Sequence, residues 1–172
     1  SNHMSNLLVQ NIKHTNGTTA QTIDSSGNTT VSQNLTVSGS EILTPARPCF
    51  YVRNLNFPYQ TGGIGTGGTV DINVGSHYNS SNGRFTAPVA GIYMMMMMTQ
   101  YYDGSTGSYI TCKLYKNGSN LGNEAYQGFG NANHAQAYLN TLVSLNVGDF
   151  VEAYTDFGAR DIQNYFQGYL VG

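Results

Sequence analysis

The residue types that usually perform catalysis are scattered along this 172-residue sequence and show no catalytic spacing. The segment Gly63–Gly68 reads GIGTGG and matches the phosphate-binding pattern GxGxxG. It precedes a predicted strand, however, whereas a dinucleotide site opens a helix. His14, His77 and His134 lie far from one another, and neither a GxSxG nor an HExxH motif is present. We therefore predict a protein that is not an enzyme and needs no cofactor.

Metal and redox chemistry would depend on carboxylates and on two cysteines. Asp103, Asp156 and Asp161 are the candidates for a calcium site, because all three are expected in loops at one end of the fold. No dense run of oxygen ligands of the EF-hand kind supports such a site, so calcium is the minor alternative. Cys49 and Cys112 are far apart and form no CxxC pair, which favours two buried thiols over a disulfide.

The sequence fits a recognition function better than catalysis or metal binding. The stretches Gln100–Tyr109 and Asn117–Gln136 mix Tyr or Phe with Gly, Ser and Asn, the composition of adaptable binding loops. Rigid rings supply contact area and suit the C–H faces of sugars, while amides supply hydrogen bonds. The predicted receptor contacts are aromatic anchors and neighbouring amides: Tyr102, Tyr126, Phe129, Asn123, Asn131 and Asn133. The alternative is that these aromatic residues pack into neighbouring strands or subunit contacts.

The element that must organise the fold is Ile92–Thr99, which reads IYMMMMMT. As a strand it spans roughly 26 Å. A strand with one solvated face alternates apolar and polar residues, and this one does not, so both faces should be buried. The facing sheet covers one face, and a neighbouring subunit is expected to cover the other. The residues predicted in the core or the trimer interface are Tyr93, Met94, Met95, Met96, Met97 and Met98.

Short apolar segments separated by Asn-Gly, Asp-Gly and Gly-Asp turns follow from residue 49 onward. This pattern predicts an all-β fold, most simply a jelly-roll β-sandwich. The predicted strands are Cys49–Leu55, Thr69–Val74, Arg84–Thr86, Gly91–Thr99, Tyr109–Lys116, Ala137–Asn146, Phe150–Thr155 and Gln163–Val171. No segment predicts a helix.

The first part of the chain differs from the rest. Residues 1–4 look like an expression-tag remnant, and residues 5–45 contain no aromatic residue and too few apolar ones to build a core alone. We predict a short β-rich stalk in which Val31, Leu35 and Val37 of three chains pack around one axis; a disordered tail is the alternative. Pro45 and Pro48 mark the boundary, because paired prolines stop both helix and ladder. Residues 46–172 are the predicted head.

Composition excludes several classes of partner. Only 9% of residues are charged, against about a quarter in ordinary domains, and the net charge is −2. Without a basic patch, nucleic acid is not an expected partner. No apolar run reaches the ~20 residues of a membrane span, so no membrane insertion is expected. A surface of hydroxyls and amides suits a protein that works outside a cell.

Four ordered motifs make residues 48–172 resemble a known family. Residues 78–95, YNSSNGRFTAPVAGIYMM, carry a Gly-x-Phe-x-x-Pro-x-x-Gly-x-Tyr pattern. LYKNG (114–118), LVSLNVGDFVEAY (142–154) and FQGYLV (166–171) follow in order. Together they resemble the globular head of complement component C1q, a jelly-roll family related to tumour necrosis factor. The resemblance implies a homotrimer in which one sheet of each subunit packs around a threefold axis. Here methionines replace the aromatic residues that normally follow the motif's tyrosine.

Residues 11–31, NIKHTNGTTAQTIDSSGNTTV, resemble segments that precede such heads in tail-fibre and other virion proteins of marine bacteriophages. This resemblance implies a virion structural protein on a tail fibre, knob or capsid-surface fibre. Its trimeric head would attach to a host cell-surface molecule such as a glycan, and its stalk to other virion proteins. The alternative is a secreted C1q-like recognition or adhesion protein of cellular origin. Such proteins commonly carry collagen-like Gly-X-Y or coiled-coil heptads before the head, and neither pattern is present here.

Overall fold

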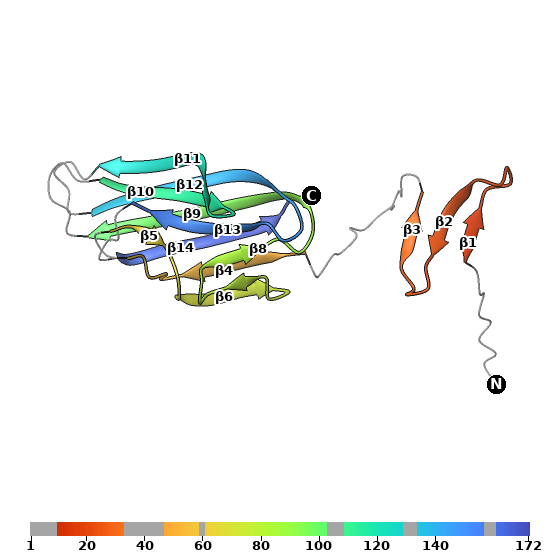
Figure 1. Ribbon diagram of the computed structural model, residues 1–172, viewed down its shortest axis with the longest axis horizontal. Coiled ribbons are helices and arrows are strands. Elements are labelled where there is room, and N and C mark those ends of the chain that lie inside the picture. Colours follow the sequence, from red (N-terminus) through yellow and green to blue (C-terminus); the bar gives the residue numbers. More distant parts are fainter. Residues whose placement is uncertain (1–9, 33–46, 59–60, 103–108, 129–133, 157–160) are drawn as a thin grey trace, which may run out of the picture. The chain divides into compact units, whose positions relative to one another are not determined.

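The computed structural model describes residues 10–32, 47–58, 61–102, 109–128, 134–156 and 161–172 (Figure 1). At positions 102, 134, 161 and 162 the description covers the backbone alone. Every regular element in these ranges is a strand, so they contain no helix that could span a membrane. The chain divides into two compact units, Ser1–Thr44 and Pro45–Gly172, which are described separately below.

The first unit contains a small antiparallel sheet. Its strands are β1 (Asn11–Lys13), β2 (Thr19–Ile23) and β3 (Thr29–Val31). Each hairpin turn needs a glycine in the left-handed region, Gly17 with φ 86° and Gly27 with φ 83°. Ile12 and Val31 lie in one row across the sheet and are 47% and 38% exposed. Leu35 and Val37, predicted to pack with Val31, lie outside the described residues.

The second unit is a sandwich of two antiparallel sheets (Figure 1). The five-stranded sheet has the order β12 (His134–Leu145), β9 (Gly91–Tyr102), β14 (Asp161–Leu170), β4 (Cys49–Arg53) and β6 (Thr69–Val74). The six-stranded sheet has the order β11 (Ser119–Gly128), β10 (Tyr109–Lys116), β13 (Phe150–Thr155), β8 (Arg84–Thr86) and β7 (Tyr78–Asn79), and β5 (Gly63–Ile64) pairs with β13. The predicted all-β sandwich fold is confirmed.

One predicted loop was wrong. Residues 119–128, inside the stretch 117–136 expected to be a recognition loop, form strand β11, which pairs with β10 along its length. Strand β11 lies at the edge of its sheet and is mostly exposed. Its only partly buried side chains are Leu121 and Ala125. The register shifts near Gly122, whose φ is 81°, and this bulge breaks the alternation that would have predicted a strand.

The GxGxxG segment and the first family motif meet in the six-stranded sheet. Gly63 and Ile64 form β5, which pairs with Tyr154 and Thr155 of β13. The backbone of this segment therefore takes part in strand pairing and does not form a phosphate-binding loop. Gly83 has φ 73°, and a Cβ there would collide with the carbonyl oxygen of Gly65. Only glycine fits this turn into β8 without displacing the neighbouring backbone.

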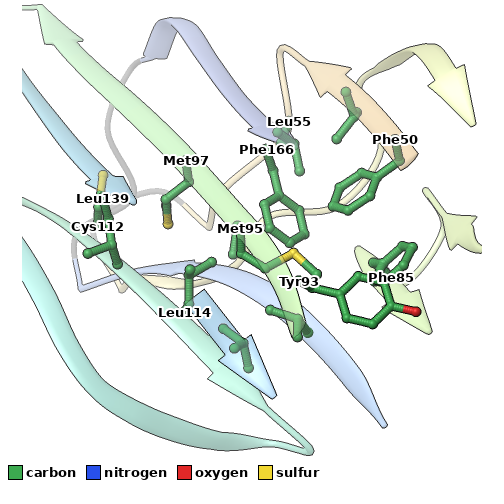
Figure 2. Packing of buried hydrophobic residues seen from close by; sticks show 14 of the residues in the cluster. Phe50, Leu55, Phe85, Tyr93, Met95, Met97, Cys112, Leu114, Leu139 and Phe166 are labelled. Carbon is green, nitrogen blue, oxygen red and sulfur yellow. The ribbon is translucent and has the colours of Figure 1, made fainter. Parts of the chain in front are cut away.

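The core lies between the two sheets and is organised by the central strand β9. Tyr93, Met95 and Met97 are fully buried, and Figure 2 shows them following one another along β9 with Phe85 beside Tyr93. The Phe85 and Tyr93 ring centroids are 5.5 Å apart. Within the described residues neither cysteine forms a disulfide: Cys112 is buried in this core, whereas Cys49 is half-buried rather than fully buried.

Candidate functional site

The outward face of the five-stranded sheet carries the other side chains of β9. The register places Met94, Met96 and Met98 there, in rows with residues of β12 and β14. The rows are Tyr138–Met98–Tyr165, Asn140–Met96–Gln167 and Leu142–Met94–Tyr169. Large apolar side chains of this face stay exposed in the single chain: Ile72, Ile92, Tyr138, Leu142 and Tyr169. We call this surface the methionine face.

The polar side chains at the centre of the methionine face are uncharged, whereas an ion pair between Arg53 and Asp71 lies on its β4 and β6 side. The Gln167 Nε2 donates to Met96 Sδ at 3.6 Å, and the Tyr138 hydroxyl donates to Gln136 Oε1 at 2.6 Å. The described side chains of β9, β12 and β14 include no charged group on this face. Burial raises the pKa of the Tyr165 phenol, because ionisation would place a charge among poorly hydrated neighbours. The centre of the face is therefore electrically neutral.

The outward face of the six-stranded sheet is chemically different. Lys113 Nζ lies 2.9 Å from Glu124 Oε2 and 2.7 Å from Asp156 Oδ2, and these bonds raise the pKa of Lys113. The Tyr115 and Tyr154 rings stack at 4.5 Å. Aromatic rings and charged side chains thus alternate on this face.

A second ion pair lies further along this sheet. Arg84 Nε donates to Glu152 Oε1 at 2.8 Å, and the guanidinium lies 4.1 Å from the centroid of the Phe150 ring. The Glu152 side chain is only 5% exposed, so Arg84 supplies the counter-charge for a buried carboxylate.

The calcium candidates do not form a described site. Asp156 is paired with the Lys113 ammonium, while Asp103 and the Asp161 side chain lie outside the description. Among the described residues, no group of three or more His, Cys, Asp or Glu is arranged to hold a metal ion.

Two of the six predicted receptor contacts have described side chains, and both belong to β11. Tyr126 is 72% exposed and forms a T-shaped pair with Tyr109, with ring centroids 6.4 Å apart. Asn123 Nδ2 donates to Thr141 Oγ1 of β12 at 2.9 Å, so it links the edges of the two sheets. Tyr102 is placed by its backbone at the end of β9. Phe129, Asn131 and Asn133 lie outside the described residues.

The residues that surround Tyr126 are not among the predicted receptor contacts. Tyr109 closes the predicted recognition stretch Gln100–Tyr109 but is not among the predicted anchors, and Lys113 is predicted only as part of a strand. Glu124 was hidden in the supposed loop, and Asp156 was considered only for calcium. The signal that could have identified them is the alternation of β10, whose outward positions hold Tyr, Thr, Lys and Tyr. Their convergence with Asp156 depends on strand order, which the sequence does not state.

Comparison with known proteins agrees with this architecture. The family model for the C1q domain matches residues 52–171, well over half of the chain. No curated protein matches. The globular domain of zebrafish complement 1qA is similar in structure, with a TM-score of 0.58 and 16% identity over 73% of this chain and 98% of that chain. Murine APRIL at pH 5.0 is also similar, with a TM-score of 0.53 and 10% identity over 72% of this chain and 99% of that chain.

These low identities bear on the fold alone, which resembles that of both proteins. The family assignment rests on the sequence match, which includes all of β9 to β14. The chain belongs to the C1q domain family.

Proposed function

We propose that this protein is a non-enzymatic, extracellular recognition protein that acts as a homotrimer, with the methionine face as the contact between subunits. The observation that carries the proposal is the exposure of large apolar side chains around the neutral centre of that face, with Leu142 59% and Tyr138 53% exposed. A group of large exposed apolar side chains on one sheet face is typical of a protein–protein contact. Methionine side chains adapt to irregular gaps, which suits packing between copies.

A closed ring explains how the methionine face of every subunit can be buried against a neighbouring subunit. Head-to-tail contacts between identical chains form a closed ring when the rotation between neighbours closes, and every copy of the contact surface is then paired. The resemblance to C1q heads supports a ring of three. Native mass spectrometry at micromolar concentration tests this proposal: a species of three chains is expected, and a monomer would contradict it.

In the proposed assembly the N-terminal sheet also packs against its copies. Ile12 and Val31 lie in one row of this sheet, and β1, β2 and β3 have no second layer in the described part of their unit. A small sheet with one uncovered apolar face is marginally stable in water. Three such sheets that bring Val31, with Leu35 and Val37 further along the chain, around one axis would bury that face. Protection of Ile12 and Val31 amides from hydrogen exchange is expected; exchange at unfolded-chain rates would contradict the stalk.

We assign this trimer to the surface of a bacteriophage virion, where the stalk joins other virion proteins and the head attaches to the host cell. The polar β-strand segment ahead of the head supports this assignment. The second candidate is a secreted recognition protein of cellular origin, favoured by the structural likeness to a complement head. Sequencing the DNA that flanks the gene separates the two: capsid, portal or tail genes are expected, and genes of a cellular chromosome would favour the second candidate.

A further inference from the structure

We propose that the outward face of the six-stranded sheet binds a neutral saccharide at a cluster formed by Tyr109, Lys113, Glu124, Tyr126 and Asp156. We call this group the tyrosine–carboxylate cluster. The inference deepens the proposed recognition function, on which its biological context rests, by naming the ligand class and the residues. The cluster belongs to the sheet opposite the methionine face, so it stays accessible in the proposed trimer.

The aromatic part of the cluster is an exposed corner. Tyr126 is 72% and Tyr109 45% exposed, and their ring planes meet at 71°. The residue opposite Tyr109 in the ladder is Gly128, which has no side chain to fill the space beside the rings. A pyranose ring presents an apolar C–H face that can cover one tyrosine while its edge contacts the other. Rigid tyrosines of this kind give contact area with little loss of conformational entropy.

The polar part of the cluster lies one row further along the strands. Glu124 and Lys113 are register partners, two residues along from the row of Tyr126, a step of about 7 Å. The Lys113 side chain is 14% exposed and is held by Glu124 of β11 and by Asp156, which directly follows β13. The backbone N–H of Asp156 donates to Thr111 Oγ1 at 2.7 Å, which ties β13 to the row of Tyr126.

These groups are positioned to bond sugar hydroxyls. Each ion pair joins one carboxylate oxygen to Lys113 Nζ, and an ionised carboxylate has further lone pairs that can accept a hydrogen bond from a hydroxyl. A hydroxyl group both donates and accepts, so it can bridge a carboxylate and an ammonium. Hydrogen bonds to charged groups are stronger than those between neutral groups. Because the ion pairs already fix the side chains, less freedom is lost on binding.

Charge selects among saccharides. The cluster holds one ammonium and two carboxylates, which gives a local charge of about −1 at neutral pH. Such a site repels sulfated and sialylated sugars and accepts neutral hexoses and N-acetylhexosamines. A single shallow site binds weakly, but three copies on one trimer would bind a dense glycan surface through avidity.

The test is binding of the full-length protein to a printed array of neutral oligosaccharides of glucose, mannose, galactose and N-acetylglucosamine, together with sulfated and sialylated oligosaccharides. Tyr126→Ala removes the exposed ring, Tyr126→Phe keeps the ring without its hydroxyl, and Glu124→Gln removes one charge. We expect binding to a neutral oligosaccharide that falls roughly tenfold or more in Tyr126→Ala and in Glu124→Gln, the effect of losing about one anchor. Tyr126→Phe should retain most of it.

Three results would overturn the site: no binding to any neutral oligosaccharide, a preference for acidic ones, or unchanged binding in Tyr126→Ala. Light scattering on the same samples separates this proposal from the proposed assembly. A trimer that binds no neutral saccharide overturns the site and leaves the assembly standing. A monomer whose binding depends on Tyr126 supports the site and contradicts the assembly.

Discussion

Met97→Ala measures how much the central strand contributes to the core. Met97 is fully buried on β9, and its register partners are Leu139 of β12 and Phe166 of β14. The substitution removes Cγ, Sδ and Cε, and at about 0.8 kcal/mol for each group the lost burial is roughly 2.4 kcal/mol. The cavity that remains between two sheets adds to this cost, so we expect the free energy of unfolding to fall by about 3–5 kcal/mol per chain.

The assay is urea-induced unfolding followed by circular dichroism, with wild type and variant at the same chain concentration, because the stability of an oligomer depends on concentration. The sequence contains no tryptophan, so tryptophan fluorescence cannot serve as the signal. Met97→Leu is the matched control: it keeps nearly the same volume and should cost less than about 1.5 kcal/mol. A loss below about 1 kcal/mol in Met97→Ala would refute the placement of this side chain in the core.

Two further predictions concern charged groups of the head. Arg84→Met should lower the free energy of unfolding by roughly 1.5–3 kcal/mol, because the buried Glu152 carboxylate loses its charged donor; urea unfolding measures this, and an unchanged midpoint would contradict it. The hydrogen bond from Asn117, with others, lowers the pKa of Asp149 from 3.8 to about 2, so its stabilising effect is complete above about pH 4 and is lost as the pH falls through 2. Asp149→Asn should therefore lower the melting temperature at pH 7, with a difference from wild type that shrinks between pH 4 and pH 2; a difference independent of pH would count against this reasoning.

The sequence was enough to predict the fold because its strongest patterns are local. The run of methionines in Ile92–Thr99 and the turns around it identify the central strand without knowledge of its neighbours. Which methionines point inward could not be predicted, because all five are apolar and either set of alternate residues could face the core. In the structure Tyr93 packs beside Phe85 between the sheets, so the alternate residues Met95 and Met97 also point into the core.

The candidate sites were harder to predict, because they depend on edges and on strand order. Strand β11 has few apolar residues and a bulge, so Tyr126 was expected in a loop instead of on a sheet edge. Asp156 was assigned a possible metal role because nothing in the sequence shows that Lys113, 43 positions earlier, lies within 2.7 Å of it. A pairing between strands distant in sequence is tertiary information, and residue patterns within one segment do not contain it.

The central claim is that the methionine face joins three chains, and light scattering of wild type beside two aspartate variants tests it most directly. Wild type should have three times the 18.6 kDa mass of one chain. Met96→Asp should have the mass of one chain, because it would bury an unpaired charge between subunits. Thr86→Asp, which places the same charge on the outward face of the other sheet, should stay trimeric. A monomeric wild type, or a trimeric Met96→Asp variant, would contradict the account.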